Sequence, residues 1–332
     1  MDACLYDPEH GFYASGVGMA GRRGDFLTSV EVGPLFGAVV ARWLDFHWDR
    51  LGQPDPFVVA DVGAGPGTFA RELHAARPRC IEALDLVLIE RSPSGRSLHD
   101  RTLGRSLVDL DALECAHVIF ANELLDNLAV RVLQRHRGQW LEVFVGPGEG
   151  PSRQRLLPAS DVPAVVTALT APLVGNAQED HPPSVPVARC AAEWVDAARA
   201  KLVEGGRLLA FDYGADTAEL AWRAPTAWLR TFRQHQPGTS PFESPGQQDI
   251  TCDVPLDQLP PPLSRMRQAD WLRHWGIEAM VEEGRKIWSE RAALGDLASI
   301  RARSRVREAD ALLDPNGLGW FWALEWDGLA EP

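Results

Sequence analysis

The stretch Asp61-Val62-Gly63-Ala64-Gly65-Pro66-Gly67-Thr68 decides the fold that this sequence predicts. It closes a short apolar run over 57–62, which is typical of a buried parallel strand, and it opens a helical pattern over 68–76. A glycine-rich turn between a strand and a helix is the context in which a backbone closely approaches a nucleotide. The stretch therefore predicts a strand, a turn and a helix with a ligand at the turn.

The spacing of these glycines indicates the kind of ligand. The third glycine of G-x-G-x-G comes one residue earlier than in the G-x-G-x-x-G of dinucleotide sites, and no basic residue stands in the loop. A phosphate-free adenosyl ligand is therefore favoured, and S-adenosylmethionine fits because its ammonium group needs an acceptor. The cofactor-binding residues predicted in the loop are Asp61, Gly63, Gly65 and Gly67. The alternative is a tight turn that binds nothing.

Strands and helices continue to alternate beyond this loop. Further strands are predicted over 84–89, 106–110, 117–121 and 207–212, a hairpin over 130–145, and helices over 35–48, 190–202, 268–274 and 286–305. Such alternation predicts an α/β fold with a doubly wound, mostly parallel Rossmann-like sheet. Residues 317–326 predict a final strand that runs antiparallel to the others.

The composition divides the chain into regions. Residues 1–50 predict an N-terminal cap or lid, and residues 51–332 predict the main domain. Two stretches rich in proline, near 146–186 and 214–265, predict irregular loops inserted above the sheet. The functional loops of doubly wound folds follow the carboxyl ends of the strands, so we expect these insertions to contact the substrate.

Two strand ends carry polar residues that suit a binding site. Glu90 ends the second predicted strand, where a carboxylate can accept both ribose hydroxyls of an adenosine; the alternative is a solvated strand end. Asp212 and Tyr213 end the fifth predicted strand, and we expect them to face the same crevice. These positions predict that the ligand lies along the carboxyl edge of the sheet.

An acidic pair follows the fourth predicted strand. Glu123 and Asp126 are three residues apart, so they share one face if the segment is a helical turn. Two carboxylates on one face can grip a guanidinium by paired hydrogen bonds and help to remove a proton from it. The alternative is a helix start at which Asn122 is the cap and the acidic residues favour the helix dipole.

The overall composition narrows the partners and the compartment. The 33 Lys and Arg against 46 Asp and Glu give a formal net charge of −13, which disfavours nucleic acid and anionic membrane surfaces as partners. No run approaches the roughly 20 apolar residues of a membrane span. The 5 cysteines form no CxxC pair, and the N-terminus lacks a signal-peptide pattern. These features predict a metal-free protein of the reducing cytoplasm.

Several motifs lie in order along nearly the whole chain. They are CLYDPEHGFY at 4–13, GDFLTSVE at 24–31, IERS at 89–92, NELLD at 122–126, FDYG at 211–214, LRTFR at 229–233, PGQQDIT at 245–251 and GLGWF at 317–321. With the glycine loop, they resemble the MidA-like family of S-adenosylmethionine-dependent methyltransferases, whose mitochondrial members are the complex I assembly methyltransferases. Where that family has Asp-Ala-Leu-Pro, this chain has Asp-Asn-Leu-Ala over 126–129, a difference that bears on the substrate more than on the cofactor.

The resemblance implies a fold, a cofactor and a substrate. It implies a class I methyltransferase fold, S-adenosylmethionine as the methyl donor and, as in characterised members, a protein arginine as the acceptor. Thr28 and Ser29 would lie in the cap over the cofactor, and Asn122 would be a further cofactor-binding residue. Glu123 and Asp126 would be the catalytic pair that orients the guanidinium.

Two alternatives come from other classes of protein. A nicotinamide-dependent oxidoreductase is disfavoured by the early third glycine and because the sequence contains no Tyr-x-x-x-Lys. A non-catalytic assembly partner that keeps the fold is disfavoured by the intact glycines and by Glu90. A comparison of the equilibrium binding of S-adenosylmethionine with that of NAD distinguishes a methyltransferase from the oxidoreductase.

Overall fold

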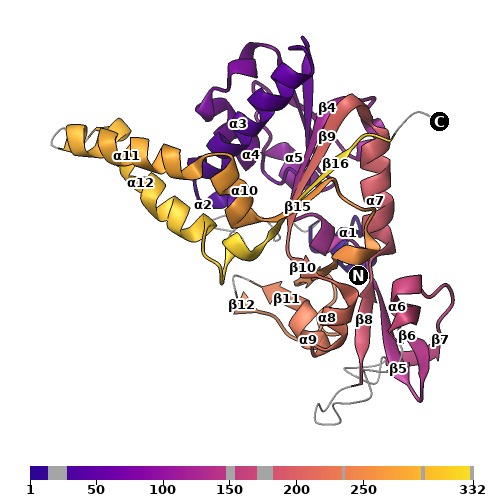
Figure 1. The fold of residues 1–332 in the computed structure, drawn as a ribbon. Coiled ribbons are helices and arrows are strands. Elements are labelled where there is room, and N and C mark those ends of the chain that lie inside the picture. Colours follow the sequence, from indigo (N-terminus) through magenta and orange to yellow (C-terminus); the bar gives the residue numbers. More distant parts are fainter. Residues whose placement is uncertain (14–27, 147–153, 170–181, 234–235, 293–295, 330–332) are drawn as a thin grey trace.

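A seven-stranded sheet forms the centre of the molecule (Figure 1). The computed structural model describes residues 1–13, 28–146, 154–169, 182–233, 236–292 and 296–329. In the order β15-β16-β9-β4-β1-β2-β3, the strands are β15 (Ser264–Arg267), β16 (Trp322–Asp327), β9 (Leu202–Asp212), β4 (Ala116–Asn122), β1 (Phe57–Val62), β2 (Leu84–Ile89) and β3 (Arg105–Leu107). Among these seven, β16 alone runs opposite to the other six, which confirms the predicted doubly wound, mostly parallel sheet and its antiparallel final strand.

Helices cover both faces of this sheet. α3 (Pro34–Arg50), α4 (Thr68–Ala76) and α10 (Gln268–His274) pack on one face, and α7 (Arg189–Ala200) packs on the other. Because side chains alternate along a strand, Val59 of β1 contributes to the first of these cores and Val58 to the second. The whole of β1 is buried, which explains why its sequence is a continuous apolar run.

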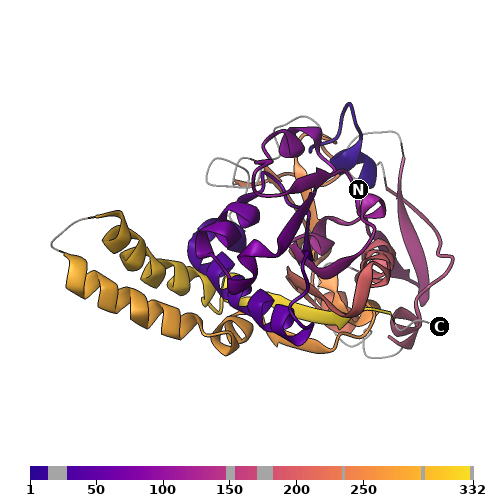
Figure 2. The same ribbon diagram turned by 90° about the horizontal axis from the view of Figure 1, so that it is seen from above.

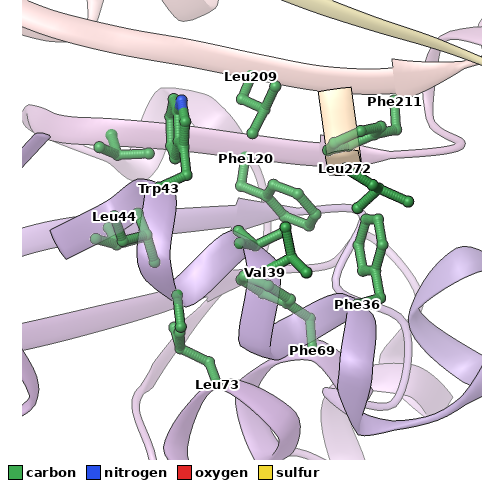
Figure 3. Packing of buried hydrophobic residues seen from close by; sticks show 14 of the residues in the cluster. Phe36, Val39, Trp43, Leu44, Phe69, Leu73, Phe120, Leu209, Phe211 and Leu272 are labelled. Atoms are coloured by element: carbon green, nitrogen blue, oxygen red, sulfur yellow. The ribbon is translucent and has the colours of Figure 1, made fainter. Parts of the chain in front are cut away.

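Aromatic rings fill the core beneath α3. Figure 3 shows Phe36, Phe69, Phe120 and Phe211 gathered between the helices and the sheet. The ring of Phe69 stacks on Phe120 with centroids 4.2 Å apart, and the ring of Phe36 meets Phe211 edge-on at 5.1 Å. Stacked and edge-on pairs of this kind are favourable arrangements for aromatic rings. They hold the carboxyl halves of β4 and β9 against α3 and α4.

The two stretches predicted as irregular loops form small sheets. β5 (Arg131–His136), β6 (Gln139–Val145), β7 (Gln154–Pro158) and β8 (Ser184–Val187) make an antiparallel sheet in the order β7-β6-β5-β8, accompanied by α6 (Ala164–Ala168). β11 (Leu229–Arg233), β12 (Gln236–Pro237) and β13 (Asp249–Cys252) make another, β10 (Gly214–Ala215) pairs with β14 (Val254–Pro255), and α8 (Thr217–Ala221) and α9 (Pro225–Trp228) lie nearby. The hairpin over 130–145 is confirmed. Much of the described part of these stretches is therefore strand or short helix, because proline at the end of a short strand does not prevent that strand from pairing, whereas residues 238–248 contain neither helix nor strand.

The end of α7 differs from the prediction. The helix ends at Ala200, before the predicted end at residue 202, and Gly205 and Gly206 lie within β9. A Cβ at Gly206 would come within 2.9 Å of the carbonyl oxygens of His117 and Val203. Glycine is therefore needed here for the close approach of β9 to β4.

The helix predicted over 286–305 is divided into two. α11 (Ile277–Arg291) and α12 (Leu297–Leu312) replace it, because the carboxylate of Asp296 accepts the N–H of Ser299 at 2.8 Å and caps a new helix. The two helices lie side by side and project from the body of the molecule as an arm (Figures 1 and 2). None of the helices in the described ranges is both long and apolar enough to cross a bilayer.

The described part of the N-terminal segment packs onto the inserted sheets. α1 (Asp2–Tyr6) carries Leu5, which shares a small core with Phe12 and with Ile250 of β13. α2 (Ser29–Val32) leads into α3, whose residues belong to the main core. Residues 14–27 of the predicted cap lie outside the described residues. The division of the chain into a cap over 1–50 and a main domain stays a prediction.

Two phenylalanines of α3 test the packing of this core. Phe36 is fully buried, whereas Phe46 is 46% exposed. We expect Phe36→Ala to lower the free energy of unfolding by about 3–5 kcal/mol, because it removes a ring from a close-packed core. Phe46→Ala should change it by no more than about 0.5–1 kcal/mol. Urea denaturation of both variants checks this; equal losses would contradict the described burial.

Candidate functional site

A cavity of about 500 Å³ lies at the carboxyl ends of β1, β2 and β4, and it is called the first cavity here. Of the residues predicted to bind a cofactor, it is lined by Thr28, Asp61, Gly63, Gly65, Glu90 and Asn122. Glu123 lines it as well. Gly67 and Ser29 do not line it. The structure therefore brings most of the predicted cofactor residues together at the predicted edge of the sheet.

The glycines of the loop have different surroundings. Gly63, Gly65 and Gly67 have φ of +75°, +51° and +75°, in the left-handed region that favours glycine. A Cβ at Gly65 would meet no atom within 4 Å, so this position opens into the first cavity. A Cβ at Gly67 would lie 3.0 Å from a methyl group of Leu88, so Gly67 allows close packing of α4 on β2. Direct contact of Gly67 with a ligand in the first cavity is thus not supported.

Glu90 holds the glycine loop in place. Its carboxylate accepts the N–H of Gly65 at 2.9 Å and the N–H of Ser92 at 2.7 Å, one bond on each oxygen. A carboxylate has roughly four acceptor positions, so acceptor capacity is left for the hydroxyls of a ligand. Burial raises the pKa of Glu90, and these two hydrogen bonds oppose the rise.

Buried polar atoms around the first cavity lack partners. Thr28 Oγ1, Asp61 Oδ2 and Asn122 Oδ1 have no hydrogen bond with any described residue. Burial, and secondarily the charge of Glu90, raise the pKa of Asp61 to about 8. Buried acceptors without partners are costly, so a ligand that brings donors would stabilise this site. S-adenosylmethionine brings an ammonium group, two ribose hydroxyls and an amino group, and it fits this set.

The charged residues that line the first cavity indicate which class of ligand it favours. The carboxylates in it are Glu31, Asp61, Glu90, Asp109, Asp111 and Glu123. Arg91 is the only Lys or Arg among the described lining residues, and it stacks over the ring of Tyr6 at 4.5 Å. An acidic lining repels the pyrophosphate of a dinucleotide and favours a ligand with positive charge.

Several lining residues were not predicted from the sequence. Asp109 and Asp111 follow β3, and their place after a strand of the sheet was a signal available in the sequence. Tyr6 and Tyr13 come from the N-terminal segment and stack with ring centroids 5.5 Å apart. The hydroxyl of Tyr13 donates to Asp249 at 3.0 Å, a contact between residues 236 positions apart that no local pattern indicates.

Glu123 is not part of a helical turn. It adopts φ +52°, an uncommon value for a residue other than glycine, and the short 3-10 helix η3 (Leu125–Asn127) begins only after it. The expected shared helical face is therefore wrong, because the N–H of Glu123 instead donates to the carbonyl of Phe211 in β9 at 2.8 Å. Glu123 Oε1 accepts the N–H of Ser29 at 3.2 Å and the amide of Asn122 at 3.1 Å. Ser29 thus positions Glu123 and does not face the first cavity.

A second cavity, of about 690 Å³, adjoins the first. Glu123 and Asn127 line both, and Asp126 lines the second one only. Asp126 accepts a short hydrogen bond from the hydroxyl of Tyr213 on one oxygen, and its other oxygen has no partner among the described residues. The acidic pair therefore meets at the junction of two cavities, although it does not share a helical face.

The pKa values of the pair are raised. Burial raises the pKa of Glu123 to about 8, with a further contribution from the charge of Asp126. Burial raises the pKa of Asp126 to about 6, and the hydrogen bond from Tyr213 opposes this rise. Two acidic groups with raised pKa at one place favour a cationic guest, whose charge stabilises their ionised forms.

The carboxylate of Asp212 holds the loop after β4 in place. Its Oδ2 accepts the N–H groups of Leu125 and Asp126 at 2.8 and 3.2 Å, and its Oδ1 accepts the N–H of Tyr213 at 2.9 Å. Asp212 is fully buried and lines neither cavity, so the expectation that it faces the crevice is wrong. Tyr213 does line the second cavity, as expected.

Known proteins resemble this chain over most of its length. Residues 39–272 match a family described as "Putative S-adenosyl-L-methionine-dependent methyltransferase". The mitochondrial protein arginine methyltransferase NDUFAF7 homolog of Drosophila melanogaster is 26% identical over 76% of this chain and 63% of its own length. NDUFAF7 of Rattus norvegicus is 25% identical over 98% of this chain and 79% of its own. This chain therefore spans less than two thirds of the Drosophila relative.

A solved structure shares the fold. A Burkholderia thailandensis protein bound to S-adenosyl-homocysteine has a TM-score of 0.75 and 24% identity, covering 98% of this chain and 85% of that one. The expected cytoplasmic location is corrected by the curated relatives, which are mitochondrial proteins. The cysteine pattern on which that expectation rested does not distinguish one reducing compartment from another.

Gly65→Val should abolish binding of S-adenosylmethionine while the fold is kept, because the new side chain would enter the first cavity. Gly52→Val is the matched control, since Gly52 has φ +79° and likewise no atom within 4 Å of a built Cβ, but does not line the first cavity. Calorimetric titration of both variants checks this. Undiminished binding to Gly65→Val would exclude this cavity as the donor site.

Asp61 should make stability depend on pH. Its pKa is about 8 in the folded state and about 3.9 when unfolded, so the folded protein holds the proton between these values. The protonated Asp61 side chain therefore stabilises the folded state fully below about pH 4, and this contribution to the free energy of unfolding is lost as the pH rises towards 8. Asp61→Asn should reduce the loss of unfolding free energy between pH 5 and pH 8 by on the order of 1–4 kcal/mol.

Urea denaturation of the donor-free protein at the two pH values measures this effect. The control is Asp55→Asn, which replaces an exposed carboxylate just before β1. If Asp61→Asn and Asp55→Asn leave the same pH dependence, the pKa of Asp61 is not raised in the way that its burial indicates.

Proposed function

Because the chain belongs to the family of S-adenosyl-L-methionine-dependent methyltransferases, we propose that it methylates the guanidinium of an arginine side chain in a protein. The observation that carries this proposal is the position of Glu123, which lines both the first and the second cavity. A methyl donor in one cavity and an acceptor in the other would meet at this carboxylate. The names of the curated relatives, which are protein arginine methyltransferases, support the choice of acceptor.

The first cavity would hold the donor. Asp61 and Asn122 would accept hydrogen bonds from its polar groups, Glu90 would accept the ribose hydroxyls, and the loop at Gly63 and Gly65 would allow close approach of the backbone. When bound, S-adenosylmethionine supplies a methyl carbon on a positively charged sulfur, which leaves as a neutral thioether. The protein therefore has mainly to orient the acceptor nitrogen and to exclude water.

The second cavity would hold the acceptor side chain. Carboxylates accept N–H groups of a guanidinium in charge-assisted hydrogen bonds, and Glu123 and Asp126 offer two at one end of this cavity. Asp126 is held by the hydroxyl of Tyr213, so its orientation does not depend on the guest. The pair would hold the guanidinium with one nitrogen towards the first cavity.

The proton balance also suits Glu123. The acceptor nitrogen forms a bond to the methyl carbon and releases one proton, so that the methylated guanidinium keeps a single positive charge. A bound guanidinium would keep Glu123 ionised, so that its carboxylate could accept that proton and pass it to solvent. Glu123 is therefore assigned both the orientation of the guanidinium and the removal of the proton.

The direct test is to incubate the purified chain with donor carrying a labelled methyl group and with cell extract, and to locate the label by mass spectrometry. Label on arginine of one protein or a few proteins supports the proposal. Label on another residue type contradicts the acceptor and keeps the methyltransferase. Binding of donor without any transfer indicates a non-catalytic assembly partner.

Glu123→Gln should lower the rate of methylation by roughly ten- to a hundredfold and leave donor affinity nearly unchanged, because it removes a charge that pairs with the guanidinium. Asp126→Asn should act similarly, and the double variant should lose less than the sum because the two carboxylates act together. Donor affinity and methylation rate measured on the same samples check this. Glu82→Gln, an exposed position away from both cavities, is the control.

Weakened donor binding with normal turnover at saturating donor would mean that Glu123 serves the cofactor. No change in either quantity would mean that the pair is structural only. Both outcomes contradict the catalytic assignment.

A further inference from the structure

Four side chains form a stack beside the second cavity. The guanidinium carbon of Arg267 lies 3.4 Å from the ring centre of Trp320 and 3.5 Å from that of Trp322. The guanidinium of Arg265 lies over Trp322 at 4.2 Å. Along the stack, arginine and tryptophan therefore alternate in the spatial order Arg265, Trp322, Arg267, Trp320. Cation–π attraction favours this arrangement.

This stack is held at several points. Arg267 donates to the carbonyl of Trp320 at 2.6 Å, and the indole N–H of Trp322 donates to the carbonyl of Gly214 at 2.9 Å. The side chain of Arg265 forms an ion pair with Asp216 at 2.8 Å. Trp320 lies at the end of the stack. Arg267 contacts both its ring and its backbone carbonyl, and so holds Trp320 in place.

Trp320 is nevertheless 51% exposed, and it lines the second cavity. Burial of the exposed part of so large an apolar side chain against a partner would be favourable. A tryptophan that is already immobilised loses little conformational entropy when a partner binds, which is why rigid aromatic residues are frequent at the centres of interfaces. Trp320 has the properties of such an anchor.

The lining of the second cavity combines acidic and apolar residues with two arginines, Arg223 and Arg230, which both pair with Asp253. Glu123 and Asp126 are called the acidic end here, and the apolar wall supplied by the segment that precedes β16 is called the apolar end. The apolar lining residues of that segment are Pro315, Leu318, Trp320 and Phe321. The ring of Phe321 lies 5.1 Å from that of Tyr213, the partner of Asp126, so the wall continues directly to the acidic end.

The size of the second cavity also indicates a larger guest than one side chain. Its volume of about 690 Å³ falls in the range of roughly 300–1,000 Å³ that buries a whole drug-sized ligand. A guanidinium at Glu123 would leave the apolar end unfilled. The polypeptide on either side of the acceptor residue is the occupant that reaches both ends at once.

We propose that Trp320, held in place by Arg267, binds an apolar side chain of the acceptor protein close to the acceptor arginine. The identity of the acceptor as arginine rests on the proposed function, whereas the apolar contact rests on Trp320 and its surroundings alone. The apolar wall would then select among the arginines of different proteins, while the acidic end would recognise the guanidinium common to all of them.

The test uses short labelled peptides that bind to the full chain in the presence of S-adenosylhomocysteine. One peptide has a central arginine flanked by leucines in a glycine and serine background, and the other has serines in place of the leucines. Fluorescence anisotropy should give about tenfold tighter binding of the leucine peptide. Trp320→Ala should remove this preference by weakening the leucine peptide only, and Trp320→Phe should keep part of it.

Phe46→Ala is the matched control, because Phe46 is a comparably exposed aromatic residue that does not line the second cavity. It should leave the preference unchanged, and thermal melts should show that all variants are folded. Equal binding of both peptides to the unmodified chain would overturn the proposal. So would a Trp320→Ala variant that weakens both peptides equally, since Trp320 would then act only on the shape of the cavity.

Peptides with citrulline in place of arginine separate this proposal from the proposed function. Weaker binding of citrulline supports recognition of a guanidinium. If citrulline binds as well as arginine while the leucine preference still depends on Trp320, the proposed acceptor is wrong and the apolar contact stands.

Discussion

The carboxylate of Asp212 is the contact on which the arrangement of the two cavities depends. It accepts three backbone N–H groups, from Leu125, Asp126 and Tyr213, and it is fully buried. It thereby ties the end of β9 to the loop after β4, and the bond from Glu123 N–H to the carbonyl of Phe211 adds a second tie. These three N–H groups all donate to one buried side chain, so loss of the Asp212 side chain would leave them without an acceptor. Together these two ties fix the loop that places Glu123, in its left-handed conformation, between the cavities.

The second general property of the site is its excess of buried carboxyl groups. Burial raises the pKa of Asp61 and of Glu123 to about 8, so near neutral pH both groups are largely protonated in the absence of ligand. A positively charged ligand favours their ionised forms, and binding would therefore release protons. By thermodynamic linkage, the same coupling makes the affinity for a cationic donor or acceptor rise with pH until the carboxyl groups are ionised.

The sequence predicted the parts of this molecule that are determined locally. The strand over 57–62, the glycine turn and the helix over 68–76 are continuous in the chain, and the structure has them at these bounds. The helical turn considered for Glu123 and Asp126 rested on their spacing alone, which describes only neighbours in the chain, whereas the conformation of Glu123 is set by contacts with Phe211 and Ser29. The small sheets were missed for the same reason, since β5 pairs with β8 across a long insertion. The role of Trp320 depends on Arg267, which is distant in sequence and adjacent only in the folded chain.

The place of β16 in the sheet has a consequence for the order in which the molecule is assembled. β16 pairs with both β9 and β15. The facing edges of these two strands therefore stay unpaired during synthesis until residues 322–327 have left the ribosome. The described residues that line the first cavity all lie at or before Ala197, whereas the second cavity needs Phe321. A nascent chain thus carries all the described lining residues of the first cavity before it carries those of the second. During synthesis, the exposed edges of β9 and β15 are the surfaces that need protection from aggregation until the last strand arrives.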